Sequence, residues 1–185
     1  AGAMLDVARR KPGGHLVRWV EGTASDLATL DPPAEPADMA IMTAHVAQVI
    51  SDQNAWRATL TATHAALRPG AHLVFESRNP AVEAWRAWVP RRSRRHVEDS
   101  PVGPVDIWLA LTEVEGDLVR YGIHYRFAPD SDDNPDNNGV ELVSRNELRF
   151  RSREELMQQL EEAGFTVDTV YGDWDQSVLE EAAAY

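Results

Sequence analysis

The spacing of apolar positions predicts a helix over residues 52–67. Its buried face recurs every three to four residues, at Trp56, Leu60, Thr63 and Leu67, as in a helix that packs on a sheet. The period then changes, because Pro69 cannot continue a helix and Gly70 accepts the positive φ of a helix cap. Residues 73–75 are a continuous apolar run, typical of a strand covered on both faces. Helix, tight turn and buried strand in succession predict one unit of a parallel sheet.

A second kind of pattern predicts antiparallel strands in the middle of the chain. Three stretches alternate or run apolar with β-branched and aromatic residues, at 105–114, 118–127 and 140–150. The first two are joined by Glu115-Gly116-Asp117, which suits a hairpin turn. The polar run 130–139 predicts a flexible surface connection, because it lacks the terminal Glu and the glycine spacing of a calcium-binding loop.

Local signals also predict elements near both ends. A short helix over 4–10 is stopped by Lys11-Pro12-Gly13-Gly14. A helix over 153–160 has Ser152 as its N-cap, Glu155 to complete a capping box and Gly164 as its stop. Residues 166–171 are expected to form the strand that follows, and residues 178–185 have a helical composition.

Four stretches, in the same order along the chain, resemble the class I S-adenosylmethionine-dependent methyltransferases. They are residues 16–27, 38–50, 66–76 and 148–167. They look like that family's third strand with its cofactor-binding loop, its fourth strand with the active-site loop, the turn with the fifth strand, and the final helix with the sixth strand. The turn reads LRPGAHLVFE, with Ala71 in place of a second glycine. The resemblance implies an α/β fold: a single domain over residues 1–185 with a Rossmann-like, three-layer α/β/α sheet, and a small antiparallel β lid inserted at about residues 81–150.

Two family features are absent from the sequence: the glycine-rich loop after the first strand and the acidic residue that ends the second. Residues 1–10 resemble the helix that follows that acidic residue, so the sheet is expected to be incomplete at its N-terminus. In the family, the first two strands lie between the third and the fourth. The gap has three explanations: an incomplete chain, direct closure of the third strand onto the fourth, or a second copy that fills the open sheet as a homodimer. As it stands, the chain is expected to be inactive and to bind no micromolar S-adenosylmethionine.

Composition narrows the function classes. The 185 residues carry a formal net charge of −12, which argues against nonspecific binding to nucleic acid or to an anionic membrane. No apolar run is long enough to span a membrane. The absence of cysteine excludes disulfides and cysteine metal sites and fits a cytoplasmic protein, and no metal site is expected. The basic cluster at 91–96 is interpreted as a solvated loop, with a site for an anionic group as the alternative.

His45 and Arg78 are the candidate catalytic residues. His45 follows a predicted buried strand at the edge where ligands bind in α/β sheets. Its side chain titrates near neutral pH, so it could take a proton from a hydroxyl or an amine, or it could cap the next helix. Arg78 follows the fifth strand at the same edge, in a Glu-Ser-Arg-Asn-Pro pattern that resembles one subgroup of the family. It could hold a substrate carboxylate or anchor its loop by a salt bridge.

The resemblance also implies which residues bind the cofactor, S-adenosylmethionine. They are Met4, Gly22, Thr23, Ala24, Thr43 and His45. Thr23 stands where the family commonly has an Asp that accepts a hydrogen bond from the adenine amino group, so it could accept that bond without a charge. Trp174, in a YGDWD stretch like that of the subgroup, could pack over the pocket or belong to the core.

The function that these features predict is methyl transfer from S-adenosylmethionine to a small molecule by the full-length protein. Methyl transfer needs alignment of the reactants more than catalytic side chains, because the sulfonium leaving group is already activated. The alternative is a noncatalytic methyltransferase-like module used for assembly, in which a partner supplies the missing strands.

Overall fold

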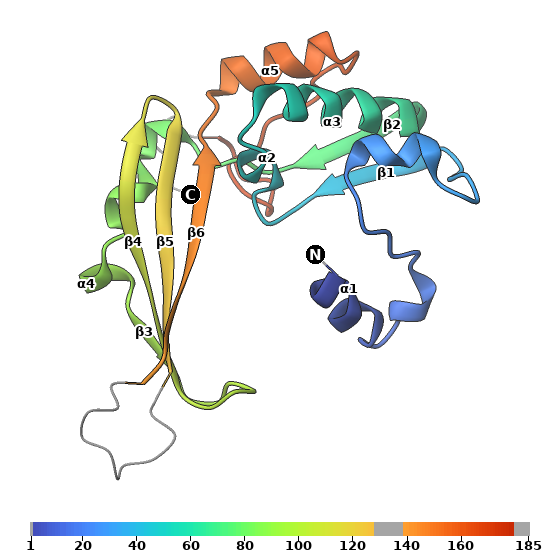
Figure 1. The fold of residues 1–185 in the computed structure, drawn as a ribbon. Coiled ribbons are helices and arrows are strands. Elements are labelled where there is room, and N and C mark those ends of the chain that lie inside the picture. Colours follow the sequence, from blue (N-terminus) through green and yellow to red (C-terminus); the bar gives the residue numbers. More distant parts are fainter. Residues whose placement is uncertain (1, 128–138, 180–185) are drawn as a thin grey trace.

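The computed structural model describes residues 2–127 and 139–179, which form two sheets joined by short helices (Figure 1). One sheet is a parallel pair of β1 (Ala37–Met42) and β2 (Leu67–Phe75). The other is antiparallel and has the order β3-β4-β5-β6. The mixture of a parallel and an antiparallel sheet confirms the predicted α/β class.

The parallel pair contains the predicted helix, turn and strand. Helix α3 (Gln53–Ala66) connects β1 to β2, and the side chain of Asp52 caps its first turn. Gly70 has a φ of 80°, as the turn requires, but it lies within β2, three residues beyond the cap at Leu67. The local signals therefore place the helix end correctly, but the prediction that Gly70 caps the helix is wrong, because the cap is Leu67 and Gly70 belongs to the strand.

Helices cover one face of the parallel pair. Trp56 and Leu60 of α3 are fully buried together with Ala47, and residues of α5 (Arg153–Glu162) pack against them. On β1, by contrast, Met39 and Ile41 are 52% and 60% exposed. Within the described part of the chain, no second helical layer covers these two side chains of β1.

The antiparallel sheet contains the three predicted strands and one that was not predicted. Strands β4 (Val105–Glu115), β5 (Leu118–Phe127) and β6 (Glu141–Arg149) pair in sequence, and a turn at Gly116 joins the first two. Val119, Leu148 and Phe150 form its core with Trp85, which lies on the short helix η4 (Ala84–Ala87). Another short helix, η3 (Pro80–Val82), precedes η4.

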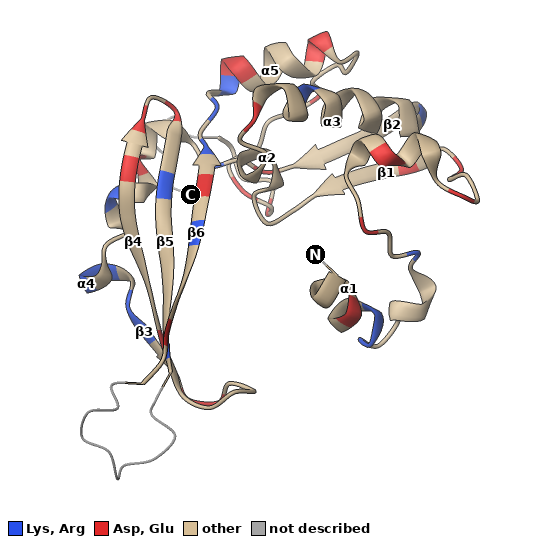
Figure 2. Cartoon of the chain, in the orientation of Figure 1, with Lys and Arg blue, Asp and Glu red and all other residues tan. Residues whose placement is uncertain are grey.

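The loop interpretation of the basic cluster is wrong. Residues 90–93 form the short helix α4 (Pro90–Ser93), and β3 (Arg95–Val97) pairs with β4 at the edge of the sheet. Pairing is possible because a strand edge needs backbone partners rather than apolar side chains, so the arginine side chains stay exposed. Figure 2 shows these basic residues along α4 and β3.

The predicted third strand, within residues 16–27, is also absent. Helix α1 (Gly2–Arg9) confirms the first predicted helix, and η1 (Gly14–Leu16), an extended segment and η2 (Ala24–Thr29) follow. Among the described residues, no strand lies beside this segment to supply the hydrogen bonds that a strand requires.

At the other end, α5 has the predicted capping box between Ser152 and Glu155, and Gly164 ends it with a φ of 94°. The strand expected over 166–171 does not form; Tyr171 makes only an isolated bridge to Val178. The predicted connection at 130–139 and the helix at 178–185 lie largely outside the described residues. No helix in the described ranges is long and apolar enough to cross a membrane.

Candidate functional site

Two loops meet at the carboxyl edge of the parallel pair. Met42 at the end of β1 is in register with Phe75 at the end of β2, so the residues that follow each strand leave the sheet at the same edge. After β1, Ala44 and His45 have φ values of 59° and 62°, in the left-handed region that non-glycine residues rarely adopt. Consecutive residues in this conformation are strained, and such strain is found preferentially at functional sites.

His45 packs against Glu76, the first residue after β2. Its backbone N–H donates to Glu76 Oε1 at 2.8 Å, and its Nδ1 lies 3.6 Å from the same oxygen. Burial lowers the pKa of His45, the nearby Arg78 guanidinium lowers it further, and Glu76 opposes both effects. His45 is therefore held in its neutral form at pH 7, in which it can accept a proton.

Arg78 completes the cluster and joins it to the antiparallel sheet. Its Nη1 donates to Gln48 Oε1 at 3.2 Å, and its guanidinium carbon lies 5.7 Å from the ring centre of Trp88. Trp88 in turn packs against Tyr121 of β5, with ring centres 4.5 Å apart. Burial lowers the pKa of Arg78 and raises that of Tyr121, so both groups lie in a partly desolvated environment.

Three polar atoms in this cluster are shielded from solvent and have no hydrogen-bond partner in the described structure. They are His45 Nδ1, Gln48 Nε2 and Glu76 Oε2. An unsatisfied buried polar group costs roughly 1–3 kcal/mol, and such groups in native proteins call for an explanation. These three atoms make the edge of the parallel pair the candidate site in the described part of the chain.

We call His45, Gln48, Glu76 and Arg78 the site cluster. The sequence predicted His45 and Arg78, and the structure brings them together. Glu76 was not predicted from the sequence as a site residue, and Gln48 was not considered. Both positions carried a signal: Glu76 is the first residue after a strand at the ligand edge, and Gln48 lies three residues beyond His45, on the same side of a helical turn.

The predicted cofactor residues are less tightly grouped. Thr43 lies in the loop beside His45, and Gly22, Thr23 and Ala24 lie at the start of η2, which packs against α3. Thr23 makes two hydrogen bonds to Asp26, from its N–H at 2.6 Å and its hydroxyl at 3.0 Å. These bonds lower the pKa of Asp26.

Met4 and Trp174 lie outside the site cluster. Met4 is 78% exposed on α1, which Figure 1 shows apart from the parallel pair. Trp174 is 56% exposed, so it is not a core residue. The described residues contain no group of three or more acidic or histidine side chains that could hold a metal ion.

A small hollow of about 210 Å³ lies elsewhere, between α3 and α5, and is lined by Arg57, Gln159, Glu162 and Ala163. Arg57 and Glu162 pair across it at 3.7 Å. Their mutual pairing leaves no unsatisfied polar group there, so the site cluster remains the better candidate for ligand binding.

Among known proteins, this chain is similar to solved structures. No protein-family model and no curated protein sequence matches the chain. Among solved structures, the CcbJ methyltransferase from Streptomyces caelestis matches 97% of this chain with a TM-score of 0.71 and 15% identity. DesVI from Streptomyces venezuelae matches 95% with a TM-score of 0.70 and 17% identity. CalS10 from Micromonospora echinaspora, an amino pentose methyltransferase solved with S-adenosylmethionine bound, matches 95% with a TM-score of 0.63 and 24% identity.

These matches cover nearly all of this chain but only part of the solved proteins. The chain spans 65% of the CcbJ structure and 68% of DesVI. A methyltransferase from Clostridium acetobutylicum, matched at 14% identity and a TM-score of 0.67, is spanned to 66%. The chain has the fold of the class I S-adenosylmethionine-dependent methyltransferases.

Proposed function

We propose that the full-length protein transfers a methyl group from S-adenosylmethionine to a small molecule bound at the site cluster. The observation that carries this proposal is the group of three unsatisfied buried atoms on His45, Gln48 and Glu76. They lie at the edge of a parallel sheet where ligands bind in open α/β folds. A donor on Gln48, an acceptor on Glu76 and a neutral imidazole suit a polar organic ligand better than an apolar one.

The residues on this edge are compatible with the cofactor. The sulfonium of S-adenosylmethionine supplies an activated methyl group, so no metal is required for the transfer. The loop that starts at Gly22 would face the adenosine part, where the Thr23 hydroxyl retains lone pairs after donating to Asp26. Thr43 and His45 would lie next to the methyl donor.

The side chains of the site cluster would align the acceptor and manage its proton. As the acceptor's nitrogen or oxygen bonds to the methyl carbon, the carbon–sulfur bond breaks and the acceptor loses a proton. His45, neutral because its pKa is lowered, can take that proton, and Glu76 beside it stabilises the resulting imidazolium. Arg78 and Gln48 offer hydrogen-bond donors that orient the acceptor's other polar groups.

The acceptor that we favour is an amine on a sugar-like molecule. CalS10, which has a similar fold, is an amino pentose methyltransferase. A buried carboxylate oxygen such as Glu76 Oε2 is satisfied best by a charged or polar N–H donor. Trp88 and Tyr121 would provide an aromatic wall next to Arg78, on the side of the antiparallel sheet.

Isothermal titration of S-adenosylhomocysteine tests the proposal. The chain is titrated beside a version that includes any residues encoded upstream of Ala1, and Glu76→Gln and Asp106→Asn variants of the binding version follow. Saturable binding by either version supports the proposal. Methyl transfer to an amino sugar that Glu76→Gln weakens and Asp106→Asn does not would support the assigned site. Absence of binding by both versions would contradict it.

A noncatalytic assembly module is the second candidate, because Met39 and Ile41 expose an apolar face on β1. A second copy of the chain that covers this face would make the protein a dimer. Light scattering distinguishes the two states: a dimer that Ile41→Lys converts to a monomer favours assembly, and a monodisperse monomer argues against it.

A further inference from the structure

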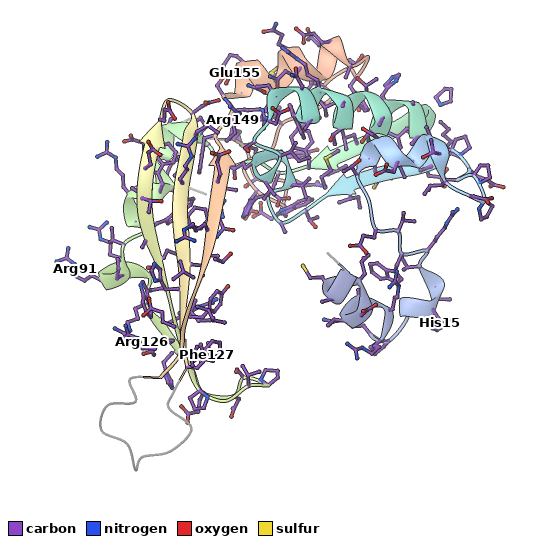
Figure 3. The ribbon with its side chains drawn as sticks, viewed as in Figure 1. His15, Arg91, Arg126, Phe127, Arg149 and Glu155 are labelled. Carbon is purple, nitrogen blue, oxygen red and sulfur yellow. The ribbon has the colours of Figure 1, made fainter. Side chains whose placement is uncertain are left out.

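The site cluster is tied to the antiparallel sheet by a short segment, residues 147–151. Three side chains of this segment reach residues 47–53, a range that contains Gln48 and begins two residues after His45. Glu147 accepts from the Ser51 hydroxyl at 2.7 Å, and Arg149 donates to the Ser51 carbonyl at 2.6 Å. Figure 3 shows Arg149 where β6 passes toward α5.

Arg151 makes the deepest of these contacts. It is 1% exposed, although arginine is almost never fully buried. Its guanidinium donates to the Ala47 carbonyl, to the Ile50 carbonyl at 2.8 Å and to Gln53 Oε1 at 3.2 Å. Two of these acceptors lie on either side of Gln48 in sequence: Ala47 belongs to α2 (Val46–Val49), and Ile50 is the C-cap of that single turn of helix.

Packing fixes the guanidinium in that position. Its carbon lies 5.0 Å from the ring centre of Trp56, and the Trp56 indole N–H donates to Gln159 of α5 at 2.8 Å. Burial lowers the pKa of Arg151 to about 10, so it remains charged at neutral pH despite the desolvation. A buried charge that lacks a carboxylate partner is costly, and its three hydrogen bonds to residues 47–53 are what compensate for it.

We propose that Arg151 is a positioning residue for the site cluster: by holding the carbonyls on either side of Gln48, it fixes the strained loop that presents His45. This inference rests on the proposed function only in treating the site cluster as a ligand-binding site. The physical link from Arg151 to His45 stands on the geometry alone. Arg151 follows β6 by two residues, and Glu147 and Arg149 of β6 contact Ser51, so the antiparallel sheet also helps to hold the segment after β1.

The test follows the titration of His45 by NMR in the full chain, without any ligand. The imidazole signal is assigned with His45→Gln, and its pKa is measured in Arg151→Met, Arg151→Lys and Arg153→Met. Arg153 is an exposed arginine on α5 and is the matched control. In Arg151→Met we expect the loop to relax and the His45 pKa to rise toward its ordinary value of about 6.5. Arg151→Lys, which keeps the charge, should restore part of the shift, and Arg153→Met should leave it unchanged.

A lowered melting temperature with an unchanged His45 titration in both Arg151 variants would show a merely structural role and overturn the proposal. If Arg151→Met does not fold, Arg151→Lys and Gln53→Leu decide by the same readout, because each weakens the contact without removing the charge. Since no ligand is present, failure of this test is distinct from failure of the proposed function, which would appear as absent binding of S-adenosylhomocysteine.

Discussion

The site cluster differs sharply from a second group of charged and aromatic residues at the far end of the antiparallel sheet. This outer cluster surrounds Trp108 and consists of Arg94, His96, Glu98, Asp106, His124, Arg126 and Glu141. His96 lies 2.8 Å from both Asp106 and Glu98, and Arg94 donates to Asp106 at 2.7 Å. The guanidinium carbons of Arg94 and Arg126 both lie 5.1 Å from the centre of the Trp108 ring.

In the outer cluster the charged groups pair with one another near solvent, whereas in the site cluster three buried polar atoms have no partner within the described structure. His45 and His96 both lie beside carboxylates, but His45 is in a partly buried cluster with unsatisfied atoms, and His96 is in an exposed cluster of paired charges. The comparison teaches that the presence of titratable residues does not mark a functional site. On our proposal, the ligand site is marked by buried polar atoms without hydrogen-bond partners, because a bound ligand would offset their cost.

The largest expected effect concerns the tryptophan next to each cluster. Trp56 is fully buried, stacks edge-on against Phe75 and carries the Arg151 guanidinium on its ring. We expect Trp56→Ala to lower the free energy of unfolding by about 3–5 kcal/mol. Trp108 is also buried, at 8% exposed, but it lies beside arginines that are about half exposed, so Trp108→Ala should cost less. Urea denaturation measures both; an equal or larger loss for Trp108 would mean that the outer cluster is the real core.

Two buried glutamines provide a matched pair. Gln159 Oε1 accepts from Trp56, so Gln159→Met leaves that indole N–H unsatisfied and should cost about 1–3 kcal/mol. Gln48 is also fully buried, but its Nε2 has no partner. Gln48→Met removes the unsatisfied Nε2, but it also removes the acceptor of the Arg78 Nη1 bond. These two effects oppose each other, so Gln48→Met should destabilise the chain less than Gln159→Met does, while weakening ligand binding. A loss of stability in Gln48→Met comparable to that in Gln159→Met would show that Gln48 is structural.

The pH dependence of the two histidines should have opposite signs. The folded-state pKa of His45 is lowered by burial and by Arg78, against the opposing charge of Glu76. The unfolded chain then binds the proton more readily, so His45 reduces stability as the pH falls below about 6.5. The pKa of His96 is raised by hydrogen bonds to Asp106 and then to Glu98. The contribution of His96 to stability is therefore present below about pH 6.5, and it is lost as the pH rises through the folded-state pKa.

Denaturation of His45→Gln and His96→Gln between pH 5 and 8, with the parent chain, separates the two contributions. The destabilisation at low pH should disappear in His45→Gln, and the loss at higher pH should disappear in His96→Gln. If NMR gave the same pKa for His45 and His96, the predicted difference between the two clusters would be wrong.

The smallest expected effect is at the surface of the outer cluster. Asp106→Asn breaks the pairs with Arg94 and His96, which are exposed to solvent and to screening by salt. The midpoint of denaturation should change less than in Gln159→Met, and high salt should reduce the difference between Asp106→Asn and the parent. A salt-independent loss would indicate that the pairs are effectively buried.

The sequence predicts the parts of the fold that depend on local signals. The face of α3, the capping box at Ser152 and the turn at Gly116 were all correct, because helix period, cap chemistry and turn residues act within a few positions. The strands expected within 16–27 and over 166–171 were wrong, because a strand forms only beside a partner. The sequence did not predict β3, because that strand forms by pairing with β4, and the residues of β3 alone give no sign of this partner.

The same distinction applies to the site. His45 and Arg78 were predictable because residues that follow parallel strands share an edge. Gln48 and Arg151 were not, since a polar side chain in a sequence gives no sign of burial. Their importance depends on contacts that span about a hundred positions, such as that between Arg151 and Ile50.

The most direct test of the account is chemical-shift mapping with S-adenosylhomocysteine on isotopically labelled protein, using the version of the chain that binds it. We predict saturable shifts at the His45 imidazole, the Gln48 side-chain amide and the loop after β1, with no change at His96 or Trp108. Shifts confined to the outer cluster, or saturable binding that leaves His45 and Gln48 unchanged, would contradict the claim that the unsatisfied buried atoms mark the ligand site.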